Sequence, residues 1–152
     1  MEKLDKIDRD ILKQLQEDAS LSVDALSERV ALSRNACWRR VKRLEESGII
    51  KARVAIVDPD AIGLGLSAFV LIRTASHDPD WSEQFERAVD SFPEIIGAHR
   101  MSGDLDYVLR VRVPDVKGYD QFYQRFIRKV AISDISASFV MDDIKDTTAL
   151  PV

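Results

Sequence analysis

The stretch that decides the fold reads Ser33-Arg34-Asn35-Ala36-Cys37-Trp38-Arg39-Arg40-Val41-Lys42-Arg43-Leu44. Within it, Cys37, Val41 and Leu44 recur at i, i+4 and i+7, so one stripe of a helix is predicted to pack inward. Ser33 is a favourable N-cap for this helix. Ser47-Gly48 ends it, since glycine suits the left-handed position that follows a helix.

Two amphipathic segments precede this helix and complete a three-helix unit. The first predicts a helix over 4–17, and the second predicts a shorter helix with Ser22 as its N-cap. Only the tight connection Leu32-Ser33 separates the second helix from the third. Three helices, the last two joined by a very short turn, form a helix-turn-helix. The apolar positions of the first two are Leu4, Ile7, Ile11, Leu12, Leu15, Val23, Leu26 and Val30.

The outer face of the third helix has the composition of a DNA reader. With the apolar stripe facing in, long polar and basic side chains are left to face out, as the major groove requires. Arginine can bond guanine bidentately and asparagine can bond adenine. We therefore predict base contacts from the first half of the helix and phosphate contacts from its second half. The predicted DNA-binding residues are Ser22, Ser33, Arg34, Asn35, Trp38, Arg39, Arg40, Lys42 and Arg43.

The distribution of charge supports this prediction better than the total does. The chain has a net charge of −4, which alone would disfavour nucleic acid. Residues 1–57, however, hold 12 Lys/Arg against 10 Asp/Glu, whereas residues 58–152 hold 10 against 16. Residues 33–44 contain five basic side chains and no acidic one. A local cationic face can bind phosphate while the acidic remainder disfavours non-specific contacts elsewhere.

The second half of the chain predicts an α+β domain. A β-like run at 49–57 acts as a strand linker, and Pro59, Gly63 and Gly65 mark a boundary near 65. Strands are then predicted over 66–74, 95–101, 107–113 and 135–141, with helices over 80–92 and 116–130. This β-α-β-β-α-β order is the ferredoxin-like arrangement. The predicted organisation is a winged helix-turn-helix at 1–48, a linker at 49–65 and a ferredoxin-like domain at 66–152.

The chain resembles the Lrp/AsnC family of transcription regulators over almost its whole length. The similarity lies in the opening Leu4-Asp5-Lys6-Ile7-Asp8, in Arg40-Val41-Lys42-Arg43-Leu44 followed by Gly48-Ile49-Ile50, and in the turn Ser102-Gly103-Asp104-Leu105-Asp106-Tyr107. Cys37-Trp38 and the ending Ile144-Lys145-Asp146-Thr147-Thr148 are similar to a branch that includes cysteine-responsive activators.

This resemblance implies a sensing role for the second domain, of the RAM type. Members bind a small effector, usually an amino acid, at a site between subunits, and assemble dimers into tetramers or octamers. Gly103 permits close backbone approach, and an aspartate near it can meet an ammonium group. The linker strand is expected to pair with its copy in the partner. The predicted effector-binding residues are Met101, Gly103, Asp104, Leu105, Asp106, Tyr107, Ser136 and Ser138.

Other functions fit the sequence less well. An effector-independent DNA-organising protein, whose second domain only oligomerises, stays open. An enzyme is disfavoured because no nucleophile–base pair or metal cluster has a convincing spacing, and His77 and His99 are isolated. No phosphate-binding glycine loop is present, so no cofactor is predicted. RNA binding by the second domain is disfavoured, since its strands lack stacking aromatics and the domain is acidic.

The composition predicts a cytoplasmic, nucleoid-associated protein. Apolar residues make up 45% and charged residues 32% of the chain, the balance of a globular protein in water. No apolar run approaches the ~20 residues of a membrane span, and the charged start lacks a signal peptide's apolar region. The single cysteine, Cys37, excludes an intrachain disulfide and fits a reducing compartment. Its place on the inward stripe predicts a small core residue.

Overall fold

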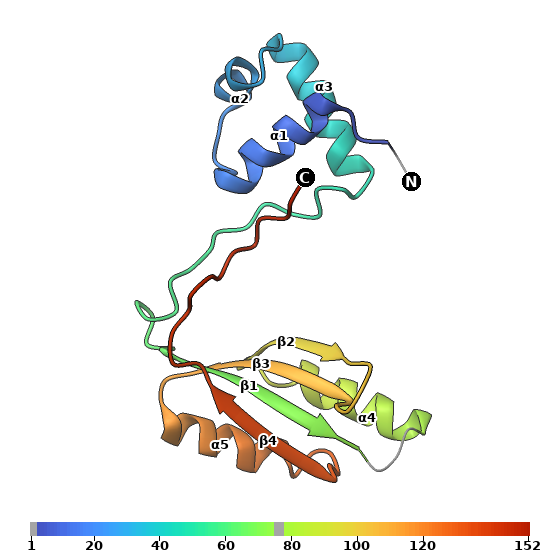
Figure 1. Cartoon of the computed structure of the whole chain (residues 1–152), viewed down its shortest axis with the longest axis vertical. Helices are drawn as coiled ribbons and strands as arrows, with labels where there is room; N and C mark the ends of the chain where they lie inside the picture. The colour runs from blue at the N-terminus through green and yellow to red at the C-terminus, as the bar shows by residue number, and fades with distance from the viewer. Residues whose placement is uncertain (1–2, 75–77) are drawn as a thin grey trace. The chain divides into compact units, whose positions relative to one another are not determined.

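The computed structural model describes residues 3–74 and 78–152, and the chain divides into two units (Figure 1). The first unit runs to Ile56 and also includes Lys145–Val152, while the second is Val57–Ile144. Each unit has its own cluster of buried apolar side chains. Among the described residues, no helix has the length and apolarity to cross a membrane.

The first unit contains the three predicted helices, α1 (Lys6–Glu17), α2 (Val23–Arg29) and α3 (Arg34–Glu46). Asp5 caps α1, and Ser22 and Ser33 cap α2 and α3 by accepting hydrogen bonds from backbone N–H groups three residues on. Gly48 follows α3 with φ 74°, as the C-terminal position predicted for it requires. The N-caps predicted from Ser22 and Ser33 are thus confirmed.

The turn between α2 and α3 is held by a left-handed residue and a backbone hydrogen bond. Ala31 adopts a left-handed conformation with φ 52°, and the Leu32 N–H donates to the Ser27 carbonyl at 2.9 Å. Behind this turn, the fully buried side chains of Ile11, Cys37 and Leu44 tie α1 to α3. The inward stripe predicted for α3 is therefore confirmed, and its opposite side is left to solvent.

The second unit is a four-stranded antiparallel sheet with the order β2-β3-β1-β4. Its elements are β1 (Leu66–Arg73), α4 (Pro79–Asp90), β2 (Ile95–Arg100), β3 (Tyr107–Val113), α5 (Val116–Phe126) and β4 (Asp134–Phe139). Alternate residues of β1 and β3 are buried against aromatic side chains of α4 and α5, so both helices cover one face. The predicted α+β, ferredoxin-like arrangement is confirmed.

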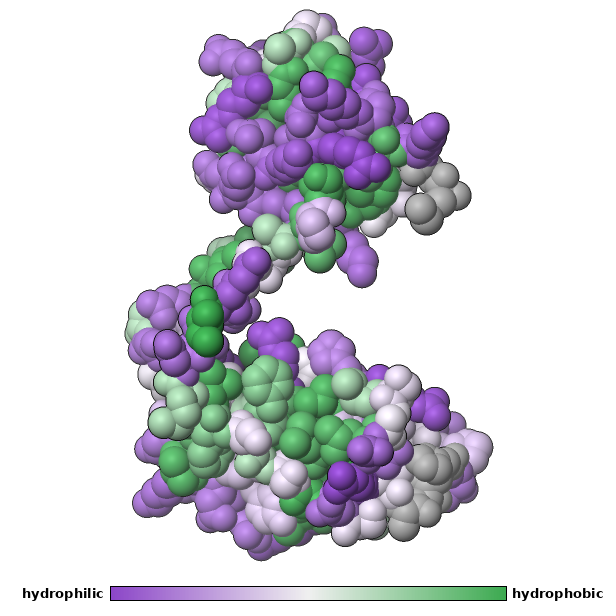
Figure 2. All heavy atoms as spheres, viewed as in Figure 1, coloured by the Kyte–Doolittle hydropathy of each residue, from purple (hydrophilic) through white to green (hydrophobic). Residues whose placement is uncertain are grey.

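Two segments differ from the sequence-based prediction. The run 49–57, predicted as a strand, forms no strand, because none of the described strands exchanges backbone hydrogen bonds with it; residues 51–58 have no regular secondary structure. Val54 and Ile56 in this segment are 74% and 78% exposed, and apolar (green) atoms line the stretch after α3 in Figure 2. The segment Lys145–Val152, predicted as part of the second domain, groups instead with the first unit.

Candidate nucleic-acid interface and effector site

The solvent face of α3 displays the residues predicted to read DNA. Arg34, Asn35, Trp38, Arg39 and Lys42 are all exposed on this helix. Trp38 is half exposed, which is a high fraction for a tryptophan, and Lys42 Nζ lies 5.1 Å from the centre of its ring. The face thus combines an aromatic ring, an amide and several cations on one rigid element. A surface of this kind can contact phosphates and base edges together.

Two exposed cations of this face, Arg34 and Lys42, form surface ion pairs with acidic residues of the same unit. Arg34 Nε lies 3.2 Å from Asp24, and Lys42 Nζ lies 3.6 Å from Glu46, with both members of each pair largely exposed. Surface pairs of this kind contribute about 0–1 kcal/mol. Arg34 and Lys42 can therefore leave these partners for a nucleic acid at little cost.

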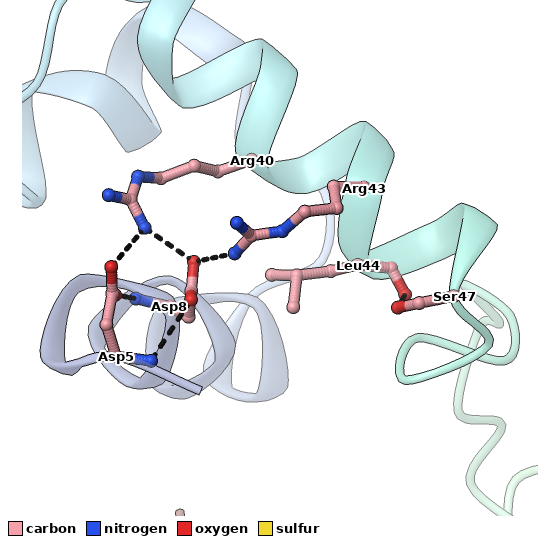
Figure 3. A network of polar contacts seen from close by, with 6 residues as sticks. All are labelled: Asp5, Asp8, Arg40, Arg43, Leu44 and Ser47. Carbon is pink, nitrogen blue, oxygen red and sulfur yellow. Dashed lines mark hydrogen bonds and ion pairs between the residues drawn. The ribbon is translucent and has the colours of Figure 1, made fainter. Parts of the chain in front are cut away.

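Arg40 and Arg43, which are predicted as phosphate contacts, both contact acidic side chains at the start of α1 (Figure 3). Arg40 Nη1 lies 2.7 Å from Asp5 and 2.8 Å from Asp8, while Arg43 Nη2 lies 2.6 Å from Asp8. The Asp8 side chain is only 2% exposed. These contacts anchor α3 on α1, so we assign Arg40 to positioning of α3.

The ionisation of this cluster agrees with its geometry. The hydrogen bond from the Asp8 backbone N–H, followed by the one from Arg40, lowers the pKa of the Asp5 carboxyl. Hydrogen bonds to Asp5 and Asp8 raise the pKa of the Arg40 guanidinium. The sequence alone predicted no role for Asp5 or Asp8. Their signal was the i, i+3 pair of acids opening a helix, the spacing of a capping box, which the structure contains.

Cys37 is completely buried on the inward side of α3. Burial raises the pKa of its thiol, which lowers the fraction of reactive thiolate. The residue thus belongs to the core. Within residues 3–74 and 78–152, no group of three His, Cys, Asp or Glu side chains is arranged to hold a metal ion. His77, which the sequence shows as isolated, lies outside the described residues.

The turn between β2 and β3 holds most of the predicted effector-binding residues. Gly103 has φ 117°, a conformation that L side chains rarely adopt, so glycine is required there. Arg73 links this turn to β4, because its Nε donates to the Asp104 carbonyl at 2.8 Å and its Nη1 lies 2.8 Å from Asp134. The turn and the start of β4 therefore lie at the same end of the sheet.

The predicted effector residues divide between the two faces of this sheet. Ser136 and Ser138 pair with Leu71 and Phe69 of β1, on the face that the helices leave uncovered. The Tyr107 ring instead packs on Phe85, with ring centres 4.4 Å apart, among the helices. Asp106 Oδ2 accepts the Thr74 N–H at 2.8 Å, so this carboxylate already has a structural partner. Leu105 is half-buried, and Met101 and Asp104 are exposed.

A helix-turn-helix with a basic outer face, followed by a separate α+β unit, defines a two-domain DNA-binding transcription regulator. Residues 4–51 match the model of a winged helix-turn-helix DNA-binding domain, and residues 67–150 match the Lrp/AsnC ligand binding domain. The chain belongs to the Lrp/AsnC family of transcription regulators, and the resemblance seen in the sequence is confirmed.

Individual relatives agree with this assignment along the whole chain. The DNA-binding transcriptional activator DecR of Escherichia coli is 50% identical over 150 residues, covering 98% of this chain and 99% of DecR. The crystal structure of an AsnC family regulator from Agrobacterium tumefaciens is 49% identical with a TM-score of 0.94, covering 97% of each chain. The L-Met complex of a Neisseria meningitidis regulator is 37% identical with a TM-score of 0.93, covering 98% of this chain and 97% of that one.

Proposed function

We propose that this protein is a sequence-specific, non-enzymatic transcription regulator whose DNA binding or assembly responds to an amino acid. The observation that supports this most strongly is the solvent face of α3, where Asn35, Trp38 and Arg39 are exposed while the opposite stripe is buried. Such a helix fits the major groove. The protein would act as a dimer on two half-sites about one helical turn apart. It would therefore be located at the chromosome, in the cytoplasm.

The exposed apolar side chains of the segment 51–58 support self-assembly. Val54, Ile56 and Val57 are 74%, 78% and 58% exposed, and the backbone of this segment pairs with none of the described strands. Pairing with the same segment of a second copy would satisfy the backbone and cover these side chains. We propose a dimer built on this segment, with further association into tetramers or octamers as the family suggests. Sedimentation measurements would determine the state.

Arg39→Ala and Lys42→Ala should have different effects on DNA binding, because we propose that Arg39 contacts bases and that Lys42 contacts phosphates. Arg39→Ala should weaken binding to the operator by about 1–3 kcal/mol and should weaken binding to random DNA less. Lys42→Ala should weaken both alike and reduce the salt dependence of binding by about one phosphate contact. Fluorescence anisotropy with operator and random duplexes, over a range of salt concentrations, measures both.

Glu17→Ala serves as the control for this comparison. Glu17 is an exposed residue of α1, away from the α3 face, and its removal should leave both affinities unchanged. Equal losses for Arg39→Ala on operator and random DNA would remove Arg39 from the base-reading residues. Trp38 would then be the next residue to test, as the largest exposed side chain on the same face.

The effector should reveal itself by stabilising the protein. An amino acid at about 100 times its dissociation constant should add about 2.7 kcal/mol of stability. For a chain of this length the midpoint of thermal unfolding should rise by about 2–8 °C. The measurement is a thermal-shift panel over the common amino acids, with cysteine, methionine, leucine and glutamate included.

The pattern of shifts distinguishes sensing from DNA organisation. A rise confined to one or a few chemically related amino acids supports the sensing function. Gly103→Ala should abolish that rise if the turn contacts the effector, since the substitution strains a backbone with φ 117°. A flat panel, with DNA binding intact, would instead favour an effector-independent DNA-organising protein.

A further inference from the structure

The last eight residues of the sequence return to the helix-turn-helix unit after the sheet is complete (Figure 1). We name this segment, Lys145–Val152, the return segment. Val152 packs against the buried cluster of the first unit. Val152 and Leu150 also line an apolar hollow of about 380 Å³, together with Leu12 and Leu15 of α1. The return segment is thus packed on α1 of the DNA-binding unit.

Gln16 of α1 binds the backbone of the return segment through both ends of its carboxamide. Its Nε2 donates to the Leu150 carbonyl at 3.1 Å, and its Oε1 accepts the Leu150 N–H at 2.6 Å. A neighbouring β-strand would satisfy the same two groups in the same way. The Leu150 side chain itself is 70% exposed, so the contact depends on the backbone and on Val152.

The return segment is also restricted by a hydrogen bond within itself and by a proline. The Ala149 N–H donates to Thr147 Oγ1 at 3.1 Å, which closes a local turn just ahead of Leu150. Pro151 fixes the backbone between Leu150 and Val152 at a φ near −65°. Because these restrictions lower the entropy lost on ordering, a short segment with few contacts can still bind.

We propose that Gln16 and the apolar residues around it form a peptide-docking site for the return segment, and that docking gives the DNA-binding unit a second, releasable connection to the sensing unit. The first connection is the chain after α3. The second begins at β4 (Asp134–Phe139), so the strand that holds Ser136 and Ser138 is joined to the docked segment by only a few residues. Release of the return segment from Gln16 would give α3 of each DNA-binding unit more freedom to adjust to DNA.

The docking is tested by amide hydrogen exchange in the full chain, without reference to any ligand. Gln16→Ala removes both hydrogen bonds to Leu150 but favours the helix, so α1 should stay folded. The Leu150 amide should exchange at least about fivefold faster, as the loss of two hydrogen bonds implies. The matched control is Gln14→Ala, which removes a glutamine of the same helix that binds Arg29 and not the return segment. An unchanged Leu150 rate in Gln16→Ala would overturn the proposal.

A second pair of variants tests the apolar part of the contact. Val152→Asp places a charge against the buried cluster, whereas Leu150→Asp alters a side chain that is mostly exposed. In Val152→Asp we expect the Leu150 amide to exchange faster. In Leu150→Asp we expect the amides next to position 150 to exchange at nearly the wild-type rate. Equal effects of the two substitutions would show that Val152 does not anchor the segment.

The role as a connection rests on the proposed function and is tested on DNA. Lengthening the operator by half a helical turn, about 5 base pairs, should weaken binding of the wild type more than binding of Gln16→Ala. A different result would be an equal loss of affinity on lengthening the operator in the wild type and in Gln16→Ala, while Leu150 exchanges faster in the variant. That result would support the docking but overturn its role in positioning the DNA-binding unit. Failure of the proposed function would appear differently, as loss of operator specificity or of the amino-acid response in the wild type.

Discussion

Asp8→Ala should lower the free energy of unfolding of the DNA-binding unit by about 3 kcal/mol. The Asp8 carboxylate is almost completely buried and accepts from Arg40, Arg43 and the Asp5 N–H. Its removal takes one of two carboxylates from Arg40, the 2.6 Å ion pair from Arg43 and the side-chain acceptor from the Asp5 N–H. Removing one member of a buried ion pair typically costs about 3–5 kcal/mol. We place the expected loss at the lower end, since the two arginines are 26% and 45% exposed and can be hydrated.

Asp8→Ala should also impair DNA binding, because Asp8 holds α3 in position and does not itself contact DNA. Asp8 lies on α1, yet it holds the middle of α3, so α3 should become less ordered without it (Figure 3). Urea unfolding followed by circular dichroism measures the stability. Operator binding at a temperature where the variant remains folded measures the second effect.

Asp10→Ala is the matched control for Asp8→Ala. Asp10 is an aspartate on the same helix, only partly buried and outside the cluster, so its removal should change stability by no more than about 0.5 kcal/mol. If Asp8→Ala were as stable as Asp10→Ala, the cluster would not be what orders α3. The double variant Asp8→Ala/Arg40→Ala should lose less than the sum of the single losses, because the two residues act as one pair.

Phe85→Ala should destabilise the sensing unit by about 3–5 kcal/mol. Phe85 is 2% exposed, and its ring packs against those of Trp81 and Tyr107, with centre distances of 5.1 and 4.4 Å. Truncation leaves a cavity in the layer between α4 and the sheet, and dense aromatic packing there cannot close it without moving the backbone. Tyr107 opens β3 directly after the turn that contains Gly103, so the same cavity should also loosen that turn.

Region-resolved hydrogen exchange measures this loss where it occurs. Exchange should accelerate in β3 and α4 of Phe85→Ala, and any thermal shift caused by the effector should shrink. Val116→Ala is the control, because Val116 is a 60% exposed residue of the same unit and its truncation should cost no more than about 0.5 kcal/mol. Unchanged exchange in β3 would show that the packing of Phe85 does not affect the order of the turn that contains Gly103.

The sequence by itself determined most of the local structure. Helical spacing of Cys37, Val41 and Leu44 was enough to give α3 its inward stripe, and alternation over 107–113 gave β3 its bounds. Capping serines marked where α2 and α3 begin. These features depend on residues close together in the chain, where periodicity and hydrogen bonding to the nearby backbone decide the conformation.

Only the tertiary structure decided which residues meet across the chain. The pairing of Asp8 with Arg40 joins residues 32 positions apart, and that of Gln16 with Leu150 joins residues 134 positions apart. Tyr107, which the sequence places at the turn, directs its ring into the aromatic layer. No local pattern encodes such contacts, because they depend on how separate helices and strands pack together. The sequence therefore determined most of the elements and the family, and packing decided which charged residues of α3 are exposed to solvent and which hold α3 in place.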